Sequence, residues 1–324
     1  MSGSPSTPSA GVTARASAKV NLLLQVGPRR DDGFHDLVTV FQAVSLHEDV
    51  TATPADEYGI TVESVGGTDV SGVPLDGSNL ALRAARLLAE RAGVDEPVHL
   101  HVRKEVPVAG GMAGGSADAA AALVACDALW RLHSGLDGLA ELGAELGSDV
   151  PFGLHGRTAV GTGRGDRLVP VLTTASFSWV FVLGTAGLST PAVFAECDRL
   201  RGLDDWSAPP ADGRLEAVEF ALRSGDVQAL GEALSNDLAE AACSLAPELT
   251  ATLEAGRAAG AVAGVVSGSG PTVALLVSSP AEARRLVRDL APVLGEGRLR
   301  TATGPVPGAR VLEPVGTTRS TRGS

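Results

Sequence analysis

Four glycines and a serine precede an alanine-rich segment, in the order PVAGGMAGGSADAA over residues 107–120. Glycine loses more conformational freedom on folding than any other residue, so a cluster of it implies an unusual backbone path or a close approach. A strand, a glycine-rich loop and a helix N-terminus form an anion site, because free amide N–H groups and the positive end of the helix dipole point the same way. The segment therefore predicts a phosphate-binding loop, and the competing interpretation is a plain tight turn.

Two familiar nucleotide motifs are absent from this loop. A P-loop requires GxxxxGK[ST], and Gly110 and Gly115 have that spacing, but Ser116 stands where the lysine belongs. No GxGxxG follows a predicted strand, so a dinucleotide fingerprint is also absent. We predict that Ser116 caps the helix and is available to Mg²⁺. Asp118 would repel a phosphate from the first helical turn, so we expect it to point away or to reach a metal.

A lysine and an aspartate stand in apolar surroundings where a solvated charge is unexpected. Lys19 lies inside an apolar strand pattern, and Asp149 lies in GSDVP, a short loop after a predicted helix. Phosphoryl transfer to an alcohol needs a group near the acceptor proton and positive charge to offset the developing negative charge. Each residue also has a simpler interpretation: a strand-edge lysine whose ammonium reaches solvent, and an aspartate that caps a turn.

Other residues with metal-binding or redox chemistry lack the partners they would need. His99 and His101 share one face of a predicted strand, but no third ligand is near, so we interpret them as an edge-strand surface pair. Cys126, Cys197 and Cys243 are too far apart for a CxxC motif and odd in number. This usage suits a reducing compartment, and we interpret the cysteines as small core residues.

Composition limits the class of protein. The 324 residues carry a formal net charge of −12, which argues against nonspecific nucleic-acid or membrane-surface binding. The first residues, MSGSPSTPSAG, have no basic segment followed by an apolar one, so we expect a disordered lead-in and a cytoplasmic protein. No oligomeric state is indicated.

The elements that must position these residues alternate between strand and helix patterns. Strands are predicted over 14–26 and 37–46, joined by a long loop, and over 49–55, 59–64, 97–106, 157–163, 166–172 and 177–184. Helices are predicted over 79–93, 116–132 and 137–146, through much of 190–258, and over 280–293, with a strand, a glycine turn and a strand at 260–279. We divide the chain into a lead-in (1–11), two domains (12–178 and 179–312) and a disordered tail (313–324).

Five ordered motifs resemble those of the GHMP kinases, and the match runs from residue 16 to about residue 290. PVAGGMAGGSADAA resembles the family's second motif, and SGSGPTVA at 267–274 is similar to its third. AKVNLLLQVGPRRDDGFHDLVTVFQAV at 18–44, LGSDVPF at 146–152 and SNDLAEAA at 235–242 resemble members whose substrate carries cytidine diphosphate. The resemblance implies an α+β fold with two domains, the first like domain 2 of ribosomal protein S5 and the second ferredoxin-like.

The resemblance also implies an activity and a set of site residues. It implies ATP- and Mg²⁺-dependent phosphorylation of the 2-hydroxyl of a cytidine diphosphate-linked methylerythritol, a step toward isoprenoid precursors by the non-mevalonate route. Lys19 and Asp149 would flank the acceptor hydroxyl. ATP would lie on Pro107, Val108, Ala109, Gly110, Gly111, Met112, Ala113, Gly114, Gly115, Ser116 and Ala117, with a second glycine turn at Gly268, Ser269 and Gly270.

Substrate choice is assigned by the resemblance to aromatic and polar groups. Phe34 and Phe194 would sandwich the cytosine ring, His35 would hydrogen-bond its edge, and Asn21 and Thr190 would approach the acceptor. The family commonly has tyrosine where Phe34 stands, so the ring face is kept and the hydroxyl is lost. Without the resemblance, both phenylalanines could equally be core residues.

Two alternatives remain open. One is another GHMP kinase, acting on homoserine, mevalonate or a sugar; the other is a noncatalytic ligand sensor on the same fold. DDGFHDL favours the cytidyl substrate because it contains His35, and the joint presence of Lys19, Asp149 and Ser116 disfavours a sensor.

Overall fold

The computed structural model describes residues 11–108, 110–202 and 212–312. The predicted lead-in (except Gly11), the predicted tail and the loop residue Ala109 lie outside these ranges. No helix within them is both long and apolar enough to span a bilayer.

The first sheet is built on a long antiparallel hairpin of β1 (Val12–Arg29) and β2 (His35–Pro54). Residues 16–27 of β1 are buried without interruption, because helices cover one side and the rest of the protein covers the other. The order across the sheet is β12 (Arg310–Val311), β1, β2, β4 (Val98–Lys104) and β3 (Gly59–Ser64). β5 (Thr158–Gly163) pairs with β2 and with β6 (Arg167–Pro170).

Three predictions for this sheet are wrong. Residues 49–55 do not form a separate strand, because β2 continues to Pro54 and pairs there with β4. The predicted long loop between the first two strands is a short turn at residues 30–34, because pairing extends outward to Arg29 and His35. β4 is also not an edge strand, since β2 and β3 flank it.

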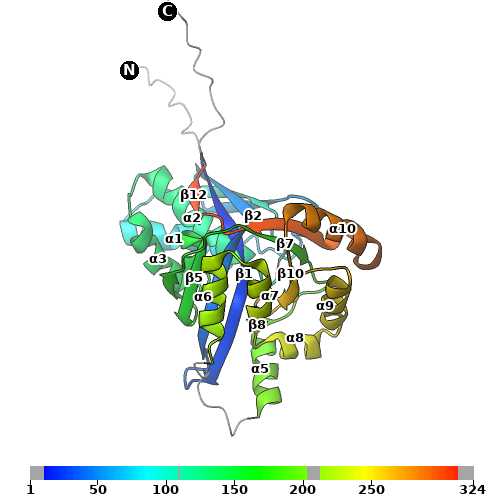
Figure 1. Ribbon diagram of the computed structural model, residues 1–324. Helices are drawn as coiled ribbons and strands as arrows, with labels where there is room; N and C mark the ends of the chain where they lie inside the picture. The colour runs from blue at the N-terminus through cyan, green and yellow to red at the C-terminus, as the bar shows by residue number, and fades with distance from the viewer. Residues whose placement is uncertain (1–10, 109, 203–211, 313–324) are drawn as a thin grey trace, which may run out of the picture.

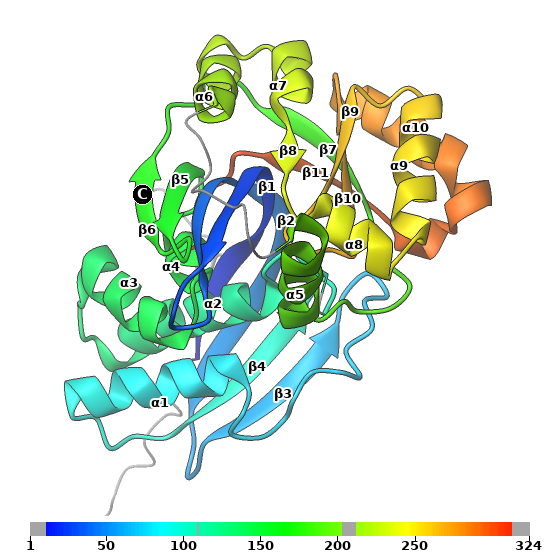
Figure 2. The ribbon, with the colours of Figure 1, turned by 90° about the horizontal axis from the view of Figure 1, so that it is seen from below.

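Helices packed against the first sheet carry the glycine loop. Figure 2 shows α1 (Leu80–Ala92), α2 (Gly114–Trp130) and α3 (Gly135–Leu146) grouped on one side of the sheet, and α4 (Val150–His155) follows them. α1 begins at the cap Asn79, whose side chain accepts from the Ala81 amide, and ends at Gly93 in the left-handed conformation. The alanine-rich α2 is buried on most sides, which small side chains permit. The sequence patterns did not indicate α4.

The second sheet is antiparallel, in the order β11 (Leu299–Gly304), β7 (Phe177–Val182), β10 (Val273–Val277), β9 (Ala263–Val266). With its helices it has the β-α-β-β-α-β course of a ferredoxin-like unit, so that expectation is confirmed. Its helices are α5 (Thr190–Arg201), α6 (Arg214–Ser224), α7 (Val227–Ala233), α8 (Ala239–Leu245), α9 (Glu248–Ala258) and α10 (Pro280–Leu294), and a 3₁₀ turn η1 (Glu296–Arg298) precedes β11. Figure 1 shows α9 and α10 at the side of the molecule away from α1 and α3.

The two sheets share a core, and two short strands from the second half of the chain join the first sheet. Trp179 on β7 donates its indole N–H to Gln42 Oε1 on β2 at 3.1 Å. β8 (Ser235–Asn236) pairs in parallel with β1 in the first sheet, within the range 190–258 where the sequence predicts mainly helix; α8 begins three residues later. A division at residues 178/179, which we keep as a proposal, falls inside β7, and β12 returns to the first sheet.

Candidate active site

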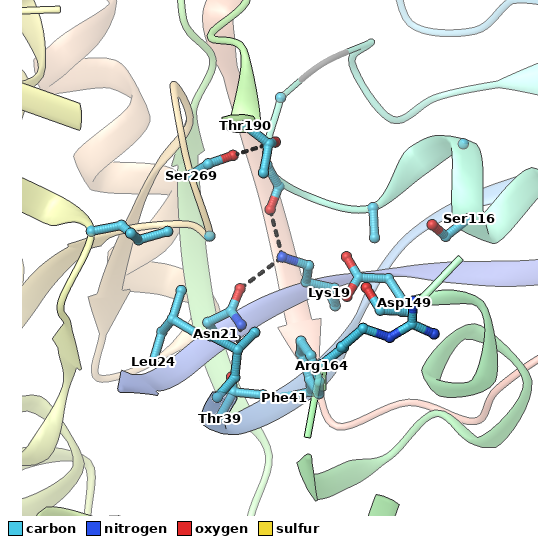
Figure 3. A pocket seen from close by; sticks show the side chains of 18 of the residues that line it. Lys19, Asn21, Leu24, Thr39, Phe41, Ser116, Asp149, Arg164, Thr190 and Ser269 are labelled. Carbon is cyan, nitrogen blue, oxygen red and sulfur yellow. Dashed lines mark hydrogen bonds between the residues drawn. The ribbon is translucent and has the colours of Figure 1, made fainter. Parts of the chain in front are cut away.

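A buried lysine lines a cavity beside the glycine loop. Lys19 is 4% exposed, and its Nζ donates to Asn21 Oδ1 at 2.7 Å and to the Gly111 carbonyl oxygen at 2.8 Å (Figure 3). Asn21 Nδ2 in turn donates to Thr39 Oγ1 at 2.8 Å, which fixes the amide orientation. This network excludes the interpretation of Lys19 as a strand-edge lysine that reaches solvent. Burial lowers the pKa of Lys19 below its ordinary value, and the charge of Asp149 opposes that effect.

Asp149 lines the same cavity, although 130 residues separate it from Lys19 in the sequence. It stands at the cap position of α4, yet its side chain makes no capping hydrogen bond. The carboxylate is therefore not occupied as a turn cap and is available to the cavity (Figure 3). The structure thus brings together the amine and the carboxylate that the sequence singled out. We call this cavity, of about 340 Å³, the central pocket.

The N-terminus of α2 forms one wall of the central pocket, through Gly114, Gly115 and Ser116. Ala113 precedes the helix in the left-handed conformation (φ 59°) and provides no side-chain cap. The prediction that Ser116 caps the helix is wrong, because the helix already begins at Gly114 and Ser116 is its third residue. First-turn amides have no intrahelical acceptor, so here they remain available to an anion, with the helix dipole adding to the attraction.

Glycine is present in the loop and in the second glycine turn for two different physical reasons. At Gly111 (φ 74°) a Cβ would collide with the Ser267 carbonyl oxygen, because the loop packs directly on the second glycine turn. At Gly268 a Cβ would lie 2.9 Å from Lys19 Nζ. At Gly115 a Cβ would meet nothing within 4 Å. Close packing therefore explains Gly111 and Gly268, while Gly115 leaves open space at the helix N-terminus.

Asp118 points away from the pocket, as predicted, and is held by a buried lysine. Lys104 Nζ donates to Asp118 Oδ2 at 2.7 Å and to Glu48 Oε1 at 2.9 Å. Burial, and next the charge of Asp118, raise the pKa of Glu48 well above its ordinary value, and burial raises the pKa of Asp118. Burial acts to lower the pKa of Lys104, but the two carboxylates outweigh it and raise that pKa. Asp118 is thus committed to a structural ion cluster.

A second cavity of about 540 Å³ lies at the turn of the β1–β2 hairpin, and we call it the hairpin pocket. Its lining includes Phe34, His35 and Phe194. Phe34 is 53% exposed, whereas the His35 and Phe194 rings stack with centroids 5.0 Å apart. His35 Nε2 lies 2.8 Å from Asp198 Oδ1, which holds the imidazole in place. The exposed Phe34 ring is not a core residue.

Thr190 lines both pockets, and its hydroxyl hydrogen-bonds the Ser269 hydroxyl at 2.8 Å. The first residue of α5 is thereby tied to the second glycine turn.

Several predicted residues stand apart from these cavities. The side chains of Met112 and Ala117 are 0% and 1% exposed and face the core, because α2 packs that side of the loop against the first sheet. Pro107 and Val108 are not among the residues that line the central pocket, and Ala109 lies outside the described residues. His99 and His101 both hydrogen-bond Thr61 Oγ1 at 3.0 Å, and no described group of three or more His, Cys, Asp or Glu side chains could hold a metal.

Sequence reasoning missed Arg164 and Asp198. Arg164 lies in the turn between β5 and β6 and lines both pockets. The signal that could have found it is the arginine between two glycines in GTGRGD, since a cation in a glycine turn is well placed to meet an anion. Asp198 carries no local signal, because it contacts His35 only through the tertiary fold.

Known proteins resemble this chain over most of its length. Residues 79–157 match the family model for the GHMP kinases N terminal domain, and residues 219–293 match that for the GHMP kinases C terminal. A 4-diphosphocytidyl-2-C-methyl-D-erythritol kinase of Kineococcus radiotolerans is 79% identical over 293 residues, covering 90% of each chain. One of Leifsonia xyli subsp. xyli is 52% identical over 306 residues, covering 93% of this chain and 98% of that protein.

Solved structures agree with this relationship. The crystal structure of a 4-(cytidine 5'-diphospho)-2C-methyl-D-erythritol kinase superposes with a TM-score of 0.72 at 33% identity, covering 90% of this chain and 98% of the other. The homoserine kinase of Cytophaga hutchinsonii superposes with a TM-score of 0.70 at 16% identity, covering 96% and 100%. At that identity the second match shows a shared fold alone.

Proposed function

This chain belongs to the GHMP kinase family, and we propose that it transfers the γ-phosphoryl group of ATP to the 2-hydroxyl of 4-diphosphocytidyl-2-C-methyl-D-erythritol. This reaction is a step of the non-mevalonate route to isoprenoid precursors. The observation that carries the proposal is the meeting of Lys19 and Asp149 in one pocket walled by the N-terminus of α2. The kinases that share the most sequence with this chain among those compared act on that substrate by name.

The triphosphate of ATP would lie against the main chain at Gly114, Gly115 and Ser116, where free amides and the helix dipole attract it. The open space at Gly115 supports this placement. Lys19 would lie between the triphosphate and the acceptor alcohol. Its ammonium donates to the Gly111 carbonyl oxygen of the glycine loop and also interacts with the charge of Asp149. Few residues are needed, since phosphoryl transfer depends mainly on alignment and charge stabilisation.

Asp149 would orient the acceptor hydroxyl and accept its proton as the new P–O bond forms. Lys19 would offset the negative charge that develops on the transferred group. The low-dielectric surroundings of Lys19 strengthen that interaction relative to water.

Mg²⁺ would accompany ATP, and Ser116 Oγ is a side-chain oxygen on the α2 wall of the pocket that could reach it. A bound Mg²⁺ would neutralise part of the phosphate charge. Asp118 is not available to it, because Lys104 holds that carboxylate. The absence of a cluster of acidic ligands among the described residues fits an ion held mainly by the nucleotide.

The cytosine end of the substrate would lie in the hairpin pocket, stacked by Phe34 and Phe194, with His35 at the base edge. Stacking on an apolar ring contributes about 1–3 kcal/mol per base. We also propose a cytoplasmic location, which the free cysteines Cys126, Cys197 and Cys243 support.

A single-turnover assay with labelled ATP and candidate alcohols tests this function. We expect phosphorylation of the cytidyl substrate, and Asp149→Asn to lower kcat by at least ~100-fold while nucleotide affinity stays nearly unchanged. Asp137→Asn, the same change on an exposed residue of α3, should leave both quantities unchanged.

Three results would contradict the proposal in different ways. Normal turnover by Asp149→Asn would remove that residue from the reaction. Turnover of homoserine, mevalonate or a sugar in preference to the cytidyl alcohol would assign another GHMP kinase activity. Nucleotide binding without transfer to any alcohol would indicate a ligand sensor.

A further inference from the structure

The central pocket and the hairpin pocket meet along a shared wall. Residues that line both are Leu37, Ser148, Arg164, Thr190 and Phe194. Four of these side chains are apolar or neutral, and Arg164 alone among the five carries a charge. The charge on the wall that the two pockets share therefore comes from one guanidinium group.

The proposed substrate has three parts, and the inference rests on that proposed function. Its base would occupy the hairpin pocket and its acceptor alcohol would lie beside Lys19 and Asp149 in the central pocket. The diphosphate that joins these ends must then cross the wall that the pockets share. A dianionic group passing this wall meets Arg164.

The present contacts of Arg164 leave its guanidinium N–H groups able to donate to such a ligand. Its backbone N–H donates to Asp166 Oδ1 at 3.2 Å, which fixes the turn, and its Nη2 lies 3.4 Å from Asp166 Oδ2. In the described part of the chain that long contact is its one side-chain hydrogen bond, of five possible donors. The side chain is 40% exposed, and its guanidinium carbon lies 5.5 Å from the centre of the Phe34 ring.

The glycine loop and the other arginine of the hairpin pocket do not fit this role. Gly114, Gly115 and Ser116 line only the central pocket, as expected for groups that hold ATP. Arg29 lines only the hairpin pocket, and its Nε faces the Gly33 carbonyl oxygen at 3.4 Å. In the view of Figure 3, the side chains of Arg164 and Asp149 lie on the same side of Lys19.

We propose that Arg164 binds the diphosphate of the cytidyl substrate and so determines the preference for a nucleoside diphosphate-linked alcohol. The planar guanidinium pairs with phosphate oxygens through two parallel N–H···O bonds, a geometry that lysine lacks. Its contact with Phe34 aligns it beside the ring that stacks the base. Asp166 exchanges its long contact with Arg164 for solvent when the phosphate binds.

Calorimetric titration of cytidine, CMP and CDP tests the proposal, with a nonhydrolysable ATP analogue at saturation to keep these ligands out of the glycine loop. The intact chain should bind CDP more tightly than cytidine. Arg164→Gln should reduce this CDP preference by about tenfold or more, with cytidine affinity within about twofold, because the base contacts remain. Arg164→Lys should keep an intermediate preference. Arg167→Gln, which removes an exposed charge three residues away and outside both pockets, should behave as the unmodified chain.

Kinetics add a readout that a structural role would not produce. Arg164→Gln should raise KM for the cytidyl substrate by about tenfold or more with KM for ATP unchanged. An unaltered CDP preference in Arg164→Gln overturns the inference, as does a rise in KM for ATP alone. An equal loss of cytidine and CDP affinity also overturns it, since that pattern assigns Arg164 to the packing of Phe34. If the CDP preference depends on Arg164 but the intact chain does not phosphorylate the cytidyl alcohol, the proposed function fails and the diphosphate site stands.

Discussion

Two buried lysines of the first sheet, on β1 and β4, have opposite environments. Lys104 lies between Glu48 and Asp118, and its pKa is raised. Lys19 donates to the neutral oxygens of Asn21 and Gly111, and its pKa is lowered. A paired charge holds a structure together, whereas a charge kept from water without a bonded carboxylate is available to a reacting anion. The contrast separates the structural lysine from the candidate catalytic one.

Replacement of Lys104 should therefore destabilise the fold in a pH-dependent way. Lys104→Met leaves Glu48 and Asp118 buried without their cation, and we expect a loss of about 3–5 kcal/mol in the free energy of unfolding at pH 8. The raised pKa values mean that the folded state holds protons that the unfolded chain has released. Stability then falls as pH rises above the ordinary carboxyl pKa values, so the loss should be smaller at pH 5.

Urea unfolding at pH 5 and pH 8 measures this difference. Lys19→Met is the matched control, since it removes an equally buried ammonium and relieves a burial cost; its loss should stay below about 1 kcal/mol. Equal, pH-independent losses in both variants would show that the Glu48–Lys104–Asp118 cluster has no special electrostatic role.

At the scale of elements, residues 110–115, where the glycine loop runs into α2, combine two requirements. Gly111 allows the loop to pack on the turn at Gly268–Gly270, and Ser267 Oγ beside that turn donates to the Gly111 carbonyl oxygen. Gly115 is already helical and faces open space in the central pocket. Part of the glycine cluster thus allows close packing, and part leaves space in which a ligand can contact the main chain.

Alanine at these two positions should give opposite results. Gly111→Ala places a Cβ against the Ser267 carbonyl at a positive φ, so we expect a loss of at least ~2 kcal/mol in stability. Gly115→Ala should keep or slightly raise stability, because alanine favours helix, yet weaken ATP binding on the order of tenfold. Thermal unfolding and titration of a fluorescent ATP analogue measure both. Unchanged nucleotide affinity in Gly115→Ala would contradict the placement of the triphosphate at this helix.

At the scale of the whole molecule, the site exists because distant segments share one core. β1, β2 and the strands of the second sheet bury apolar side chains in a common cluster that includes Val20, Val44, Trp179 and Leu276. β8 and β12 add residues from the second half of the chain to the first sheet. The position of the central pocket relative to the hairpin pocket depends on this shared core.

A shared core predicts that both halves unfold together. Variants that retain only Trp130 in α2, or only Trp179 in β7, should show the same urea midpoint within about 0.2 M. An ATP analogue at 100 times its Kd should raise the stability reported by both probes by about 2.7 kcal/mol. Two separate midpoints would show that the halves are independent domains.

Local pattern was sufficient for most elements and for several candidate site residues. The apolar strand around Lys19, the glycine loop and the helix over residues 79–93 are visible in the sequence because burial periodicity and turn residues act over a few positions. The α+β architecture and the kinase family were likewise accessible, through five ordered motifs.

Only the tertiary structure decided which distant groups meet. It paired Asp118 with Lys104 and Glu48, excluded Ser116 as the helix cap, gave Gly111 a packing role and placed Arg164 where two pockets join. A single arginine or aspartate has no periodic signal, and its partner can lie anywhere along the chain. The sequence by itself determined the elements and the family. Long-range packing determined the contacts of each polar residue and therefore its role.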